Sequence, residues 1–387
     1  GRHSAALEAL VFLLANKADV SVTNDAGQTA LQLAATNSTP FFFDDREKIL
    51  SLLAAEHGGA TAGINERDAN GDTALHRAAR NHWDDVSVLV ELIAAGADVN
   101  ATNFHGQTPL HLAVEKIGSW PDGGGPHSVG QSLLKTGANG NPQDINGLTP
   151  LHVLALADTS FKKEATRALL EAGANPPARD PLGRPPAPLF LSGQWPWSEA
   201  SDCIELLVKA GADLSAKDNE GKTPLHYLAS LGNQQPLLFI HSIGGTFIAA
   251  KVDFNARDHN GNTPLDLAAQ TGTKDVFNWL SKNGANWNLT NNDGDTPLHL
   301  AAKAGTKDIF DWLVKNGADL DATNNAGETP RQLALNSTNQ MWRFRADADT
   351  DIYAAARQGK LDSLAAILKA EPSLLNQTNQ FGETPMR

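Results

Sequence analysis

The chain has 387 residues, 41% of them hydrophobic, with a formal net charge of −13 at pH 7. This acidic balance argues against nucleic acid and anionic membranes as partners, because both bind through clustered Lys and Arg side chains. A single cysteine excludes a disulfide framework within the chain and favours an intracellular compartment. We expect no membrane insertion, because the sequence lacks an apolar run of about 18 residues.

The N-terminal part of the chain repeats one short pattern. Residues 1–18 predict the second helix of an incomplete repeat. The segments GQTALQLAA, GDTALHRAA, GQTPLHLAV and GLTPLHVLA then begin at Gly27, Gly71, Gly106 and Gly147. In each segment the glycine suits a tight turn, the threonine hydroxyl can cap a helix, and a proline, where present, takes the first helical position. Each segment therefore predicts a turn followed by a short helix.

The next segment strains the pattern. After Gly183 the sequence is rich in proline, and we align Ala187-Pro188-Leu189-Phe190 with TPLH. This alignment requires one extra residue after the glycine and predicts a short first helix. The segment GKTPLHYLA restores the regular pattern at Gly221.

Two successive segments, Asp258–Thr290 and Asn291–Thr323, are identical at more than half of their positions. The second segment predicts a first helix from Pro297, a second helix over Lys307–Lys315 and a left-handed C-cap at Gly317. Neither segment is long enough to bury its own apolar side, so we expect neighbouring segments to stack.

A turn, a TPLH helix, a second helix and a GAD turn in this order resemble the ankyrin repeat. One unit departs from the pattern, with Asp266 in place of the histidine. The resemblance implies an all-α fold: an ankyrin-repeat solenoid of about nine to ten helix-turn-helix repeats, with β-turn or hairpin tips and several loop insertions.

The spacing of the turn glycines predicts the domain layout. An array over 1–335 is expected to carry loop insertions near 37–48, 118–129, 184–199 and 241–252, because helices cannot lengthen without breaking the stack. Residues 336–350 form an irregular linker or cap. Residues 351–387 resemble an opening-type repeat and the start of the next one, either as a second array or as a segment that precedes Gly1 in the native order.

Several residues invite a chemical interpretation. The TPLH histidines are His76, His111, His152, His226 and His299. Their spacing places them on successive layers, too far apart to share a metal ion, and the resemblance implies that each one hydrogen-bonds the turn backbone. We interpret Cys203 as a small buried hydrophobe and Gly221-Lys222-Thr223 as a turn, because the glycine that a phosphate-binding loop needs is absent.

The aromatic residues divide into two groups. Trp279 and Trp312 occupy equivalent second-helix positions and are expected to stack in the core. Phe41–Phe43 and Trp195–Trp197 lie in predicted insertions, where they either cover exposed core or contact a partner. The island Met341–Arg345 is either a cap on the last repeat or a tether to a partner.

We predict a non-catalytic scaffold, not an enzyme, that binds a protein partner through the concave groove and the turn tips. The partner is expected to have a basic or neutral surface. The alternative is the ankyrin arm of a larger enzyme or bacterial effector, whose catalytic part lies outside this chain or is formed by the insertions. Either interpretation places the chain in the cytoplasm, or in the host cytosol for a secreted effector.

The resemblance assigns partner contacts to the residue after each turn glycine, to the residues after the small pair in each first helix, and to the turn tips. Carried onto this sequence, these positions are Asp72, Arg80, Asn81, Phe104, His105, Gln107, Glu115, Lys116, Ile145, Lys222, His259, Asn262, Gln270, Asp295, Lys303 and Glu328. We predict no catalytic residue, no metal ligand and no cofactor. Phe104 and Ile145 are expected to be anchors, and the acidic residues are expected to give this face a negative bias.

Overall fold

The computed structural model describes residues 3–36, 48–53, 63–80, 86–115, 129–157, 162–192, 197–231 and 237–336. Within these ranges the regular secondary structure is helical, as predicted. The chain divides into two compact units. Unit 1 comprises residues 1–224 and 241–252, and unit 2 comprises residues 225–240 and the chain from residue 253.

Unit 1 is built from pairs of short helices. The first helix of each pair follows a turn glycine; these helices are α2 (Ala30–Thr36), α4 (Ala74–Arg80), α6 (Pro109–Glu115), α8 (Pro150–Leu156) and α10 (Pro186–Ser192). The second helices are α1 (His3–Ala15), α5 (Val86–Ala94), α7 (Val129–Lys135), α9 (Lys162–Glu171) and α11 (Trp197–Lys209), and a short 3-10 turn, η1, spans Gly63–Asn65.

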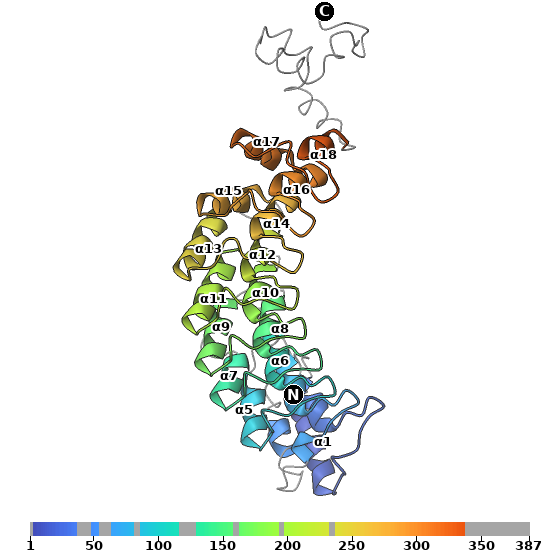
Figure 1. The fold of residues 1–387 in the computed structure, drawn as a ribbon. Coiled ribbons are helices and arrows are strands. Elements are labelled where there is room, and N and C mark those ends of the chain that lie inside the picture. The colour runs from blue at the N-terminus through green and yellow to red at the C-terminus, as the bar shows by residue number, and fades with distance from the viewer. Residues whose placement is uncertain are drawn as a thin grey trace, which may run out of the picture. The chain divides into compact units, whose positions relative to one another are not determined.

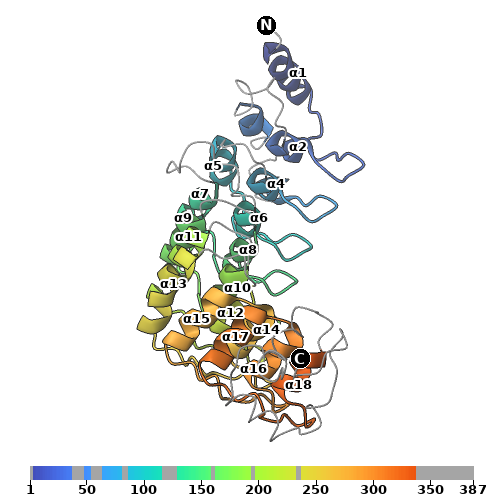
Figure 2. The same ribbon diagram turned by 90° about the horizontal axis from the view of Figure 1, so that it is seen from above.

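The helices of unit 1 form two layers. The first helices α4, α6, α8 and α10 pack side by side in sequence order, and α5, α7, α9 and α11 form the second layer against them (Figures 1 and 2). Leucine side chains fill the space between the layers, among them the fully buried Leu75, Leu110 and Leu151 of the first helices and Leu133 and Leu169 of the second. The turns that precede the first helices project from one edge (Figure 1).

Unit 2 repeats this arrangement. Its complete pairs are α14 (Pro264–Thr271) with α15 (Lys274–Lys282), and α16 (Pro297–Ala304) with α17 (Lys307–Lys315), followed by α18 (Pro330–Asn336). The predicted bounds of the twin segment are confirmed: α16 begins at Pro297, α17 spans Lys307–Lys315, and Gly317 has a φ of +86°. Local capping signals therefore located these helices correctly.

Two predictions about irregular segments are wrong. Helix α10 begins at Pro186, three residues after Gly183, just as α8 begins three residues after Gly147, so no extra residue is inserted and the helix has seven residues. The extra residues near 241–252 do not form a loop: α13 spans Leu237–Ala249 as a helix of 13 residues. A second helix can lengthen because it can bury added apolar side chains, and Ile243 and Phe247 are fully buried.

Helix α12 (Pro224–Ala229) and helix α13 each have residues in both units. Of the other predicted insertions, residues 37–47, 118–128 and 193–196 lie outside the described residues. The predicted linker or cap from 337 onward, the aromatic island Met341–Arg345 and the opening-type repeat over 351–387 also lie outside them.

Candidate functional site

The turns that precede the first helices of unit 1 are closed by both backbone and side-chain hydrogen bonds. Before α8, the Asp144 carboxylate accepts hydrogen bonds from the backbone N–H groups of Asn146 at 2.8 Å and Leu148 at 2.9 Å. The Asp144 N–H donates to the Leu148 carbonyl at 3.0 Å. Gly147 has a φ of +71°, which a residue with a β carbon rarely adopts. Ile145 and Asn146 are thereby placed at the tip of the turn.

Backbone hydrogen bonds also join several tips of unit 1 to the tip before them, although Pro181, which has no N–H, donates none. The Phe104 N–H donates to the Asn70 carbonyl at 3.1 Å, and the Ile145 N–H donates to the His105 carbonyl at 2.9 Å. Further along, the Asn219 N–H donates to the Leu182 carbonyl at 2.9 Å. Because these bonds fix neighbouring turns to each other, side chains on the tips are held in a preset spacing.

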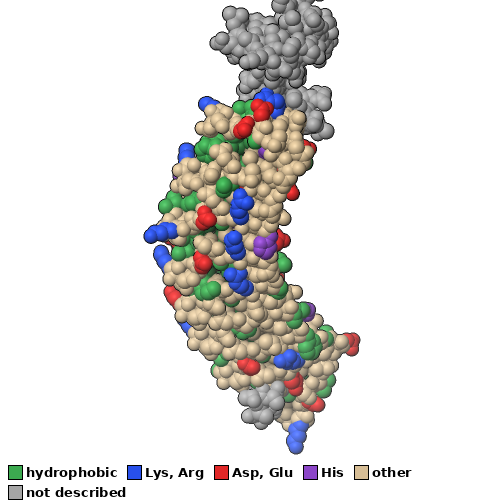
Figure 3. Space-filling view, in the orientation of Figure 1, with side chains coloured by type: hydrophobic (Ala, Val, Ile, Leu, Met, Phe, Trp, Pro, Cys, Tyr) green, Lys and Arg blue, Asp and Glu red, His purple; other side chains and the backbone are tan. Residues whose placement is uncertain are grey.

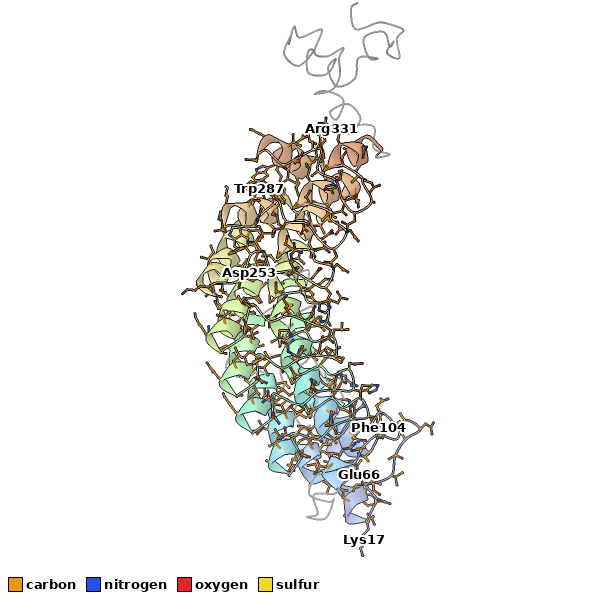
Figure 4. All side chains as sticks on the ribbon, in the orientation of Figure 1. Lys17, Glu66, Phe104, Asp253, Trp287 and Arg331 are labelled. Carbon is orange, nitrogen blue, oxygen red and sulfur yellow. The ribbon has the colours of Figure 1, made fainter. Side chains whose placement is uncertain are left out.

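Three consecutive tips of unit 1 carry large apolar side chains that face solvent. The exposed fractions are 63% for Phe104, 65% for Ile145 and 57% for Leu182. We call these three residues the apolar tip row. Figure 4 shows Phe104 at the edge of the unit from which the turns project.

The tips of unit 2 are polar. Asn292 and Asn325 take the place of the apolar residues, and each side-chain amide donates to the carbonyl of the preceding tip, at His259 (2.8 Å) and Asn292 (2.9 Å). These amides are used to hold the tips together. Asn219 of unit 1 makes the same kind of bond, to the Pro181 carbonyl at 2.9 Å. The apolar tip row therefore differs in chemistry from these asparagine tips.

Buried histidines connect the first helices α4, α6 and α8 to the following turn. The Nδ1 atom of His111 accepts a hydrogen bond from the Thr108 N–H at 3.1 Å and lies 2.9 Å from the Thr108 hydroxyl. Its Nε2–H then donates to the Leu148 carbonyl of the next repeat at 3.1 Å. Burial lowers the pKa of His111 and of the equivalent His76 and His152, which keeps the rings neutral. Both ring nitrogens are occupied by the backbone, so these histidines are structural.

Family comparison identifies this architecture. Residues 3–103, 42–120, 197–291 and 274–352 match the family model "Ankyrin repeats (3 copies)", and residues 146–181 match "Ankyrin repeat". Together these matches cover more than half of the chain. The chain belongs to the ankyrin repeat family.

Ankyrin repeats generally mediate protein interactions, and the similar proteins are diverse. A probable serine/threonine-protein kinase of Dictyostelium discoideum is 34% identical over 252 residues, which are 64% of this chain and 23% of that protein. An intracellular phospholipase A2 of Caenorhabditis elegans is 39% identical over 100 residues, or 25% of this chain and 8% of that protein. Mouse rabankyrin-5 is 29% identical over 193 residues, which are 47% of this chain and 15% of that protein. The chain therefore matches less than a quarter of the length of each of these relatives.

The structure distributes the predicted ankyrin contact residues unevenly. Phe104, His105 and Ile145 lie on adjacent hydrogen-bonded tips of unit 1. The other predicted residues that face solvent are Arg80, Glu115, His259, Gln270 and Lys303, and those that are half-buried are Gln107, Lys222, Asn262 and Glu328. Asn81 and Lys116 lie outside the described residues.

Asp72 and Asp295 are buried, and each is bound both to its own repeat and to the next one. The Asp72 carboxylate lies 3.0 Å from the Arg80 guanidinium and accepts a hydrogen bond from the Asn103 side chain at 2.8 Å. Asp295 pairs in the same way with Lys303 at 2.7 Å and with the Asn324 side chain at 2.8 Å. The structure thus departs from the expectation that these carboxylates give the face a negative bias, because a neighbouring cation neutralises each of them.

Three further residues, Cys203, Lys222 and Asn100, are held by structural contacts. Cys203 is fully buried, and burial raises its pKa to about 12, so its thiol is not activated. Lys222 pairs with Glu220 at 2.6 Å. The Asn100 amide bonds backbone at both ends, donating to the Gly137 carbonyl at 3.3 Å and accepting from the Asn139 N–H at 2.8 Å.

The tryptophans of the second helices in unit 2 pack edge-on against aromatic side chains. The Trp279 ring lies 5.4 Å from that of Phe254, and the Trp312 ring lies 5.6 Å from that of Trp287 and 5.3 Å from that of Phe277. The predicted role in packing is confirmed, but both tryptophans are half-buried and do not belong to the core. The partners differ from the expectation, because each tryptophan meets a residue from the loop before its own repeat.

Two notable residues were absent from the predicted contact set. Leu182 directly precedes the turn glycine Gly183, at the position that His105 has before Gly106, and this signal places it at a tip. Asp266 is visible in the sequence only as a departure from TPLH. In the described ranges, no cluster of three or more His, Cys, Asp or Glu side chains could hold a metal ion. None of the described helices is long and apolar enough to cross a membrane.

Proposed function

We propose that this ankyrin chain is a non-catalytic scaffold that binds a protein partner through the apolar tip row of unit 1. The observation that carries the proposal is the exposure of Phe104, Ile145 and Leu182 on consecutive turns that hydrogen bonds hold in place. Apolar anchors that are already ordered lose little conformational entropy on binding, so they contribute strongly to affinity. The remaining predicted contacts on the first helices would surround this centre.

Charge supports a partner with an apolar contact segment and a basic or neutral surface around it. The acidic side chains beside the tips are paired: Asp68 lies 2.8 Å from Arg77, and Asp180 lies 2.7 Å from Arg184. On the face shown in Figure 3, Lys and Arg side chains are interspersed with Asp and Glu side chains. The net charge of −13 would still favour the approach of a basic partner, in a manner that salt screens.

The experiment begins with affinity capture and mass spectrometry to identify a partner, and surface plasmon resonance then measures the variants. Phe104→Ala and Ile145→Ala should each speed dissociation by about tenfold or more, because anchor truncation costs about 1–3 kcal/mol. Val90→Ala is the matched control, since Val90 is 52% exposed but lies on helix α5. Unchanged dissociation in both tip variants, or an equal effect of Val90→Ala, would refute the assignment.

The comparisons favour one extension of this proposal. The chain resembles short parts of larger proteins, including a kinase and a phospholipase. We propose that it is the ankyrin arm of such a larger cytoplasmic protein, or of an effector that acts in a host cytosol. Sequencing the surrounding gene tests this extension, and a reading frame without any further domain would overturn it.

A further inference from the structure

One repeat of unit 2 lacks the histidine bridge that the repeats on either side of it make. In neighbouring repeats the Nε2–H of His226 and of His299 donates to a carbonyl of the next turn, at Asn262 and Glu328, each at 3.1 Å. Asp266 occupies the same position in α14. Its Oδ2 atom replaces Nδ1 and accepts hydrogen bonds from the Thr263 N–H at 2.7 Å and hydroxyl at 2.8 Å.

The other carboxylate oxygen of Asp266 is isolated. Asp266 is fully buried, and its Oδ1 atom has no hydrogen-bond partner among the described residues. By analogy with the histidine repeats, the acceptor across the junction would be the carbonyl of Asp295. An ionised carboxylate has no proton to donate, so the donor that His226 and His299 supply to the next turn is missing at Asp266.

The charges around Asp266 offset one another. Arg257 favours its ionised form, whereas Asp258 disfavours it. On the side of α16, the Asp295 carboxylate is paired with Lys303. Burial also keeps His299 neutral by lowering its pKa. Desolvation by burial has the largest effect on the Asp266 carboxyl group and raises its pKa from 3.8 to about 6.

We propose that Asp266 makes the junction between repeats 258–290 and 291–323 sensitive to acid, so that protonation of its carboxyl group tightens the packing of α14 against α16. The protonated group keeps its two bonds from Thr263 on one oxygen and gains an O–H on the other. That O–H supplies the missing donor toward the turn of the next repeat, as Nε2–H does elsewhere.

The direction of the effect follows from proton linkage. The pKa of Asp266 is higher in the folded protein than in the unfolded chain, so the folded state binds the extra proton between about pH 4 and pH 6. The protonated Asp266 carboxyl group therefore stabilises the folded state fully below pH 4, and this stabilisation is lost as the pH rises through 6. A shift from 3.8 to about 6 corresponds to about a hundredfold change in the unfolding equilibrium constant at pH 7.5, and to about tenfold at pH 5.

Asp266→Asn tests the proposal in the full chain. Its amide oxygen can accept the Thr263 bonds and its NH2 group can donate, as the protonated acid does, at every pH. Urea unfolding should give the variant an unfolding equilibrium constant about a hundredfold smaller than that of the natural chain at pH 7.5, and hydrogen exchange should show the change in α14 and α16. At pH 5 the two unfolding constants should differ only about tenfold. Titration of the buried histidines occurs in both proteins and therefore cancels.

Two further variants keep the test decisive if Asp266→Asn folds poorly. Asp266→His installs the side chain of the neighbouring repeats and should likewise exceed the natural chain in stability at pH 7.5. His299→Asp recreates the isolated carboxylate one repeat later and should add a second loss of stability between pH 5 and pH 7.5. A stability difference between Asp266→Asn and the natural chain that stays constant from pH 5 to pH 7.5 would overturn the proposal.

Discussion

Replacing His111 tests whether the bridge between repeats, rather than the bulk of the ring, stabilises unit 1. His111 is fully buried in α6 and contacts the backbone of its own turn and of the next one. His111→Ala removes all of these bonds. His111→Gln should retain them, because Gln32 occupies the equivalent position in α2 and already makes such bonds.

The geometry at Gln32 shows that an amide can bridge. Its Oε1 accepts a hydrogen bond from the Thr29 N–H at 2.8 Å, and its Nε2 donates to the Glu66 carbonyl at 2.9 Å and to the Asp72 carbonyl at 3.1 Å. Glutamine therefore supplies one acceptor and one donor in the places of Nδ1 and Nε2–H. We expect His111→Gln to cost less than about 1 kcal/mol, as a nearly isosteric exchange.

The cost of alanine follows from the groups that it leaves behind. The buried Thr108 N–H loses its acceptor, which costs about 1–3 kcal/mol. The Leu148 carbonyl keeps the hydrogen bond from Asp144, so losing the imidazole there costs only about 1 kcal/mol. The cavity adds about 1–2 kcal/mol. Together these effects predict a loss of about 3–5 kcal/mol for His111→Ala.

Urea denaturation followed by far-ultraviolet circular dichroism at pH 7.5 measures the free energy of unfolding of both variants. His105→Ala is the control, because His105 is exposed at a tip and should change stability by less than about 0.5 kcal/mol. If His111→Gln costs as much as His111→Ala, hydrogen bonding across the junction does not explain the stabilising role of this residue.

Two further pairs of substitutions test the turns by the same measurement. Gly106→Ala should cost about 2–3 kcal/mol, because the φ of Gly106 is +69° and an added β carbon would lie 3.0 Å from the Ile145 nitrogen. Gly137→Ala is the control and should cost about 1 kcal/mol, because Gly137 has a φ of +95° but open space around it. Equal costs would contradict the close approach of the tips. Asp295→Ala should cost about 2–3 kcal/mol, because Asp295 loses its ion pair with Lys303 and its hydrogen bond from Asn324. Asp293 is exposed, so Asp293→Ala should cost less than about 0.5 kcal/mol. Similar losses for these two aspartates would show that the buried ion pair contributes little.

The sequence by itself determined the repeat and its local punctuation. Thr296, Pro297 and Gly317 act within one turn of the chain, so their effects on helix ends are independent of distant residues and could be predicted from residue type. The exposure of Phe104 and Ile145 was also predictable, because the middle of a tight turn has no room to fold a side chain back into its own repeat. Whether these residues bind a partner stays a prediction.

Only the tertiary structure decided which polar residues are free to contact a partner. Asp72 and Asp295 occupy turn positions that looked exposed in the sequence, but the end of the following first helix brings Arg80 and Lys303 onto them. Helix α13 lengthens because the packing around it can bury more apolar surface, which no local signal records. Asp266 differs from its counterparts by one letter, yet its isolated oxygen arises only when the next repeat stacks against it and excludes water.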